Sequence, residues 1–181
     1  MAIDRGEFLE ALRESYEPYY DIHPNDSVTP LPLVFRADFH SHGESYLLIK
    51  SAKIWSDDTH EYTFLFSADR FTPEIVDACV DYALDTALPM VEPRKDHHYS
   101  NVHAIFVADQ FDDAVRSAIT KRRFSKSYKM GIYGFTLLKT AFIDLSSMDY
   151  GTNKEGHDLG DFIKKLFPKK YSKKKFLKSK E

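Results

Sequence analysis

The fold of this 181-residue chain is decided by residues 33–42, whose sequence reads LVFRADFHSH. Apolar side chains recur at every second position, at 33, 35, 37 and 39, and from Arg36 onward the intervening positions are polar. Because successive side chains of a strand point to opposite faces, this alternation predicts a half-buried β-strand with one polar face.

Two further strands are expected directly after it. Gly43-Glu44 is typical of a two-residue type II′ hairpin, which favours Gly at its first central position. We therefore expect residues 45–55 to return as a second strand paired with the first. Residues 56–59 have turn composition, and 61–68 form a third strand. The result is a three-stranded antiparallel meander.

Helix signals surround the meander. Asp4 with Glu7 three residues later predicts a capped helix at the start, and Thr72 followed by Pro73 predicts another. Residues 18–32 hold four prolines and are expected to be an irregular connection. The remaining elements are a continuously apolar strand at 102–108, a helix to about residue 121, one or two strands within 132–145, and a helix from Asp158.

The predicted order is αβββαβαβα, an α+β (or α/β) fold. We expect a single two-layer domain over residues 1–167, with helices packed on a sheet built from the meander and one or two further strands. Residues 168–181 contain seven lysines and are predicted to form a basic, mobile C-terminal tail.

Composition excludes several classes of protein. The single Cys79 cannot form an intramolecular disulfide. The sequence contains no run of 18 apolar residues, which a membrane span would require. The acidic start of the chain does not resemble a secretory or organellar signal. No Walker A, G-x-S-x-G or G-x-G-x-x-G motif occurs. We expect a soluble cytoplasmic protein that does not associate with membranes.

Charge is divided unevenly along the chain. Residues 1–120 hold 9 basic and 22 acidic side chains, whereas residues 121–181 hold 16 basic and 6 acidic ones. Such a division indicates an anion-binding end, or two parts that attract each other. The acidic stripe of the helix after Pro73 is then either a solvated face or a docking surface for a basic partner or for the chain's own tail. The stripe consists of Glu74, Asp77, Asp81 and Asp85.

Cations and aromatic rings are interleaved within residues 121–129. Cations neutralise phosphates while rings stack on bases, so this pattern of basic and aromatic residues favours single-stranded nucleic acid as the polyanion. An acidic protein surface is the other partner considered. The candidate polyanion-binding residues are Lys121, Arg122, Arg123, Lys126, Tyr128 and Lys129.

Asp38, His40 and His42 form a D-x-H-x-H string whose histidines project from one face of the predicted strand. The string resembles the opening motif of PHP-type phosphoesterases and amidohydrolases. Its H-S-H part resembles the metal-binding segment of JAMM-type metalloproteases. Either resemblance implies that His40 and His42 bind a divalent metal. The alternative is that both are solvent-facing residues beside a turn.

The order αβββαβ resembles the core of PD-(D/E)XK nucleases, which place an Asp on one strand and a D/E-x-K on the next to hold a divalent ion. With the expected hairpin, Asp38 and Lys53 share a face, and Ser51 occupies the position of the second carboxylate. Either the resemblance is a generic one of fold order, or it implies a nuclease site that has lost one acidic ligand and with it catalysis.

Our interpretation is a non-catalytic binding or interaction module, without a cofactor, that binds polyanions weakly. The alternative is a metal-dependent hydrolase or nuclease that uses Asp38, His40, His42 and Lys53 with a divalent metal.

Overall fold

The structure is a computed structural model that describes residues 4–25, 29–41, 59–95 and 97–167. In these ranges seven strands form one mixed sheet, in the order β1-β2-β3-β4-β6, with β5 and β7 both paired to the outer edge of β6. The strands are β1 (Asp21–Pro24), β2 (Leu33–Ser41), β3 (Thr59–Ser67), β4 (Tyr99–Ala108), β5 (Ser125–Ser127), β6 (Phe135–Asp144) and β7 (Asp149–Thr152).

Four α-helices cover the sheet, and together they confirm a single α+β domain. They are α1 (Arg5–Tyr16), α2 (Pro73–Ala87), α3 (Asp113–Lys121) and α4 (His157–Leu166). The predicted caps of the first two are present: Asp4 accepts a hydrogen bond from the Glu7 amide, and Thr72 accepts one from Ile75. No described helix is long and apolar enough to cross a membrane.

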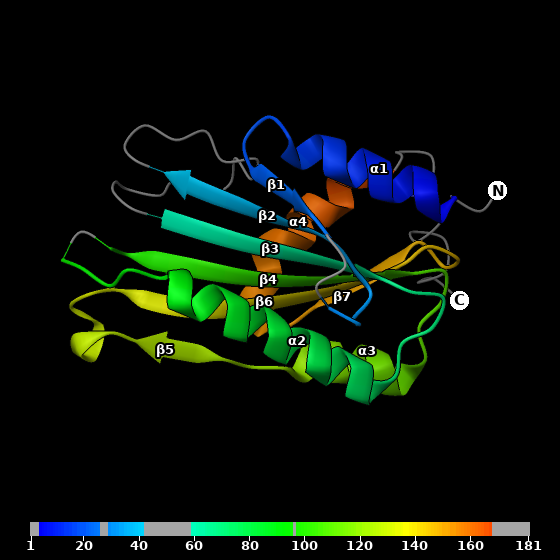
Figure 1. The fold of residues 1–181 in the computed structure, drawn as a ribbon. Coiled ribbons are helices and arrows are strands. Elements are labelled where there is room, and N and C mark those ends of the chain that lie inside the picture. Colours follow the sequence, from blue (N-terminus) through cyan, green and yellow to red (C-terminus); the bar gives the residue numbers. More distant parts are fainter. Residues whose placement is uncertain (1–3, 26–28, 42–58, 96, 168–181) are drawn as a thin grey trace.

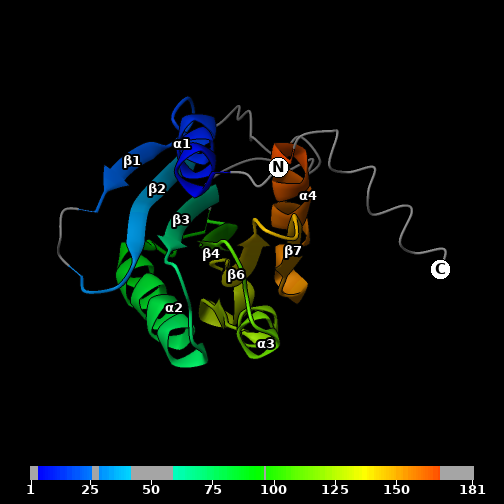
Figure 2. The same ribbon diagram turned by 90° about the vertical axis from the view of Figure 1, so that its right-hand side faces the viewer.

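The expected two-layer packing is wrong, because helices cover both faces of the sheet. Figure 2 shows α1 and α4 on one side and α2 and α3 on the other. Each face has its own apolar core. Strands β3, β4 and β6 are parallel, and successive right-handed crossovers place α2 and α3 on the same face. The two helices outside these crossovers cover the face that remains (Figure 1).

The prediction of which strands form the antiparallel meander is also wrong. β2 pairs directly with β3, so that Arg36 lies opposite Phe64, and no strand lies between them. The strand predicted over 45–55 and its hairpin lie outside the described residues. A three-stranded antiparallel meander does exist, but its first strand is β1, within the segment expected to be irregular.

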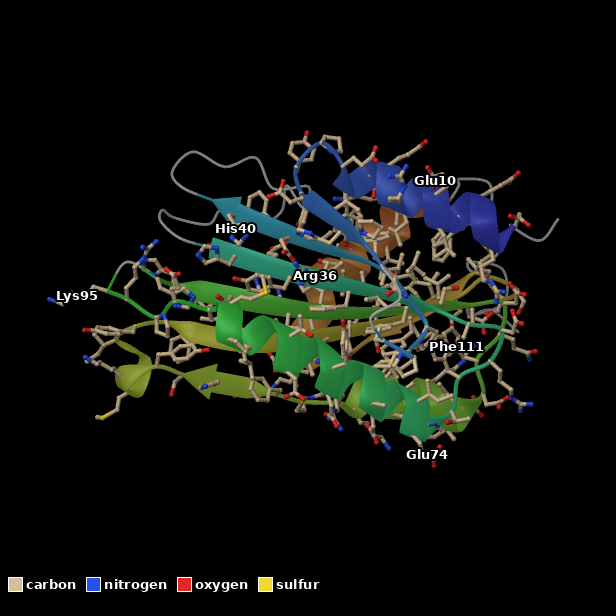
Figure 3. All side chains as sticks on the ribbon, viewed as in Figure 1. Glu10, Arg36, His40, Glu74, Lys95 and Phe111 are labelled. Atoms are coloured by element: carbon tan, nitrogen blue, oxygen red, sulfur yellow. The ribbon has the colours of Figure 1, made fainter. Side chains whose placement is uncertain are left out.

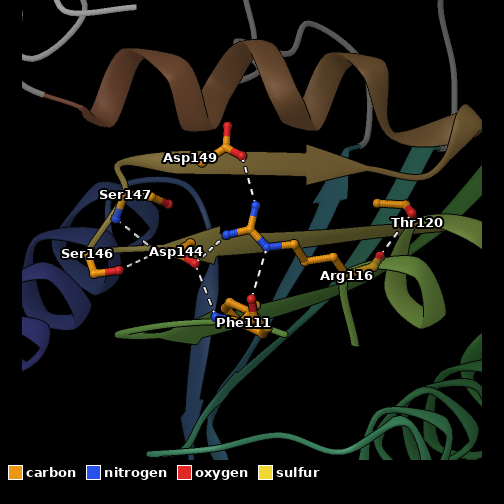
Figure 4. Close-up of polar contacts among 7 residues, drawn as sticks. All are labelled: Phe111, Arg116, Thr120, Asp144, Ser146, Ser147 and Asp149. Carbon is orange, nitrogen blue, oxygen red and sulfur yellow. Dashed lines mark hydrogen bonds and ion pairs between the residues drawn. The ribbon is translucent and has the colours of Figure 1, made fainter. Parts of the chain in front are cut away.

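The carboxyl ends of β4 and β6 are fastened by one buried carboxylate. Asp144, at the end of β6, accepts hydrogen bonds from the amides of Phe111 and Ser147 (Figure 4). It also forms an ion pair of 2.5 Å with Arg116 of α3, which in turn reaches Asp149 of β7. One side chain of β6 therefore joins a helix and two loops, and through Arg116 it is linked to β7.

Burial raises the pKa of Asp144, but the hydrogen bonds from Ser147 and Phe111 lower it further than burial raises it. The pKa thus lies below its ordinary value of 3.8. A carboxyl with a depressed folded-state pKa stabilises the protein above its ordinary pKa, and this stabilisation is lost as the pH falls through the folded value.

We predict that Asp144→Asn lowers the free energy of unfolding by about 3–5 kcal/mol at pH 7, because it leaves Arg116 without its buried partner. Asp112→Asn, in the exposed pair with Arg70, should cost less than about 1 kcal/mol. Denaturant titrations at pH 7 and below pH 4 measure both effects. The difference between the wild type and Asp144→Asn should shrink at the lower pH, and a constant difference would contradict the role assigned to this carboxylate.

Candidate functional site

Side chains from both sequence-predicted sites lie in one row on the α2/α3 face of the sheet. We call it the ring row, and it consists of His40 (β2), His60 (β3), His97 (before β4), Tyr128 (after β5) and Lys126 (β5). It crosses the sheet at the end where β3, β4 and β6 begin. Figure 3 shows His40 and Lys95 toward this end, away from Glu74 and Phe111.

Each member of the ring row contacts the next. The Nδ1 atoms of His40 and His60 are 2.8 Å apart. The rings of His60 and His97 stack with centroids 6.2 Å apart, and His97 meets the edge of Tyr128 at 6.0 Å. The Lys126 ammonium lies 5.3 Å from the centroid of the Tyr128 ring. The row is thus continuous from β2 to β5.

His97 is the fixed centre of the row. Only 2% of it is exposed, its Nδ1 lies 2.8 Å from the Tyr133 carbonyl, and its Nε2 lies 2.8 Å from the Ser100 hydroxyl. A carbonyl can only accept a hydrogen bond, so Nδ1 carries the hydrogen that it donates. Gly134 allows this approach: its φ is +81°, and a Cβ there would lie 2.5 Å from the His97 carbonyl oxygen.

Asp38 lies two residues from His40 on the same face, as predicted, but Arg36 and His23 engage it. Its carboxylate is 4% exposed and lies 3.0 Å from Arg36 Nε and 3.1 Å from His23 Nε2. The Arg36 contact is within ion-pair distance but is not aligned as a hydrogen bond. Burial, and secondarily the Asp38 charge, raise the pKa of Tyr62 to about 12.

The two-carboxylate arrangement of the nuclease alternative does not form between β2 and β3. Asp38 lies opposite Tyr62, and the acidic residue of β3, Glu61, lies opposite Phe39. Glu61 therefore points to the α1/α4 face, away from Asp38. His42 and Lys53 lie outside the described residues. Within the described ranges, no group of three His, Cys, Asp or Glu side chains could hold a metal ion.

The structure divides the predicted polyanion-binding residues into two groups. Arg122 forms ion pairs with Asp77, at 2.9 Å, and with Asp81, so the acidic stripe of α2 binds a basic residue of its own chain. Arg123 donates to nearby backbone carbonyls, and Lys121 ends α3.

The second group lies at the ring row. Lys126 and Tyr128 belong to the row. Lys129 directly follows Tyr128 in the sequence, and its ammonium lies 4.3 Å from the centroid of the Tyr133 ring. Sequence reasoning did not identify His60, and it found no reason to place His97 near His40. Both positions follow from the pairing of β2 with β3 and from the loop before β4.

Comparison with known proteins gives a family but no relative of known function. No curated protein and no solved structure matches the chain. A family model described as a domain of unknown function, DUF8052, matches residues 4–165. Since this match spans most of the chain, the protein belongs to the DUF8052 family.

Proposed function

We propose that the protein is a non-catalytic binding module that binds single-stranded nucleic acid along the ring row, weakly and without sequence preference. The observation that carries the proposal is the continuity of the row. Three imidazoles, a phenol and an ammonium contact one another in sequence from β2 to β5.

The dimensions and chemistry of the row support this ligand. Four strand spacings separate β2 from β5, so the row spans about 19 Å, long enough for a short run of nucleotides. His97 is buried and supports its neighbours, so bases can stack on the exposed ring of His40 and the half-buried rings of His60 and Tyr128. Lys126 and Lys129 are exposed and offer cations to phosphates. Stacking does not distinguish bases strongly, and the row contains no Asn or Gln that would read a base edge, so we expect little sequence preference.

We predict that single-stranded DNA binding to the full chain weakens with salt, by a log–log slope of about −0.7 for each phosphate neutralised. Lys126→Ala should make the slope less negative by about 0.7. Lys164→Ala is the matched control, because this lysine lies on α4, over the opposite face. His40→Ala should also weaken binding, because it removes an exposed ring on which a base can stack. Fluorescence anisotropy with a labelled oligonucleotide measures the affinity of each variant at several salt concentrations.

The basic C-terminal residues need a separate control. The same titrations on a chain ending at residue 167 remove the cations of 168–181. If the ring row is the site, the effects of Lys126→Ala and His40→Ala persist in the shorter chain. Binding that disappears with residues 168–181, and that neither substitution affects in the full chain, would reject the ring row.

The hydrolase alternative makes a different prediction about metal. Ligand nitrogens about 2.1 Å from a tetrahedral zinc are about 3.4 Å apart, whereas the Nδ1 atoms of His40 and His60 are 2.8 Å apart, the distance of a direct hydrogen bond. We therefore predict that untagged protein carries no stoichiometric zinc or manganese. His40→Ala and His42→Ala should leave metal content and thermal stability unchanged. Elemental analysis that finds one metal per chain, lost in these variants, would favour the hydrolase.

A further inference from the structure

The opposite face of the sheet buries a second set of polar side chains, none of which belongs to the ring row. Strands β3, β4 and β6 place Thr63, His103 and Lys139 side by side across the sheet. One row closer to the strand starts, Glu61 lies beside Asn101. All five side chains are at most 7% exposed. Polar residues at the centre of a covered sheet face are costly unless each is satisfied.

Hydrogen bonds satisfy most of this group, which we call the inner cluster. The Tyr20 hydroxyl donates to Glu61, and Thr63 Oγ1 lies 3.1 Å from His103 Nδ1. Lys139 donates to Asp158 of α4 at 2.6 Å. Burial raises the pKa of Asp158, but the Lys139 charge and hydrogen bond lower it further, so the pKa of Asp158 lies below its ordinary value of 3.8. Lys139 is thereby neutralised by Asp158.

Two side chains of the inner cluster have polar atoms that are not fully satisfied. His103 is 2% exposed, and its Nε2 has no hydrogen-bond partner. Glu61 is 4% exposed, its hydrogen bond comes from a neutral phenol, and no cation of the described residues lies within ion-pair distance of it. A buried carboxylate without a cation is strongly disfavoured. An ammonium placed beside these two side chains would compensate a Glu61 carboxylate and would also bind His103 Nε2.

One ammonium can bind both side chains. Glu61 and His103 are diagonal neighbours on adjacent strands, with Cβ atoms about 7–8 Å apart, so a single ammonium can donate to both. Burial lowers the pKa of His103 more than the Glu61 charge raises it, which keeps the imidazole neutral. When Nδ1–H donates to Thr63, Nε2 carries the lone pair that accepts from the ligand. An anionic ligand would instead add a negative charge beside Glu61.

The surroundings favour an amine with an alkyl chain. On the same face, Tyr99 and Phe135 lie at the strand starts, 44% and 38% exposed, with ring centroids 6.2 Å apart. Tyr99 precedes His103 by four residues, a distance of about 13 Å along the strand. A polyamine of about the length of spermidine that starts between Glu61 and His103 can extend toward these rings, which attract both methylene groups and a second ammonium.

We propose that the inner cluster is a binding site for a linear diamine or polyamine, with one ammonium held between Glu61 and His103 Nε2. The site is independent of the ring row, because the two lie on opposite faces of the sheet.

Isothermal titration of the full chain with 1,4-diaminobutane and with spermidine tests this site. The ligand control is 1,4-butanediol, which has the same length and no charge, and we expect it not to bind. Glu61→Gln keeps the acceptor for Tyr20 but removes the charge, so it should weaken diamine binding about tenfold or more. Glu74→Gln, on α2 over the other face, is the matched control and should change nothing.

A second measurement identifies the imidazole. Diaminobutane should shift the His103 ring nitrogen resonances in NMR spectra of the wild type, while butanediol should not. His103→Gln should reduce affinity, with circular dichroism confirming its fold; if that variant unfolds, Glu61→Gln and the wild-type spectra still decide. No diamine binding at millimolar concentration, or equal weakening by Glu61→Gln and Glu74→Gln, would overturn the proposal.

Discussion

The parallel pairing of β3, β4 and β6 is the constraint on which the rest of this structure depends. It sets Thr63, His103 and Lys139 in one row, and His60 and Ser100 in another, on opposite faces. It also requires crossovers, which carry α2 and α3 to one side and leave the other side to α1 and α4. Both candidate sites are therefore consequences of a single register, and a slip of one residue would exchange the faces of every side chain in them.

Local signals in the sequence predicted the elements better than their partners. The caps at Asp4 and Thr72 act within one turn of their helices, and both predictions are confirmed. The alternation in 33–42 correctly placed Phe35, Ala37 and Phe39 in an apolar core. It says only that one strand face is apolar, however, and carries no information on which strand lies alongside. The pairing of β2 with β1 and β3 thus could not be derived from it.

The candidate sites were predicted in part for the same reason. Asp38 and His40 share a strand, and Lys126, Tyr128 and Lys129 share one short segment, so local reasoning could group each set. Joining the sets needs His60 and His97, whose contacts are separated by 20 residues or more along the chain. The inner cluster is harder still. Glu61, His103 and Lys139 lie on three different strands far apart in the sequence, and only the parallel register shows that they meet.

The ring row lies at the amino ends of the parallel strands and the inner cluster extends from near these ends to the middle of the strands, and this placement has a physical cause. In open α/β sheets, ligands commonly bind at the carboxyl ends, where the loops diverge. Here that end is closed. The Leu145 amide donates to the Ala108 carbonyl, and Asp144 with Arg116 fills the space between β4, β6 and α3. With every acceptor of Asp144 committed to this corner, the uncommitted polar groups gather at the opposite end. The exposed members of the ring row lie at that end, His103 Nε2 lies toward the middle of the strands, and the fastened end can hold the register that both sites require.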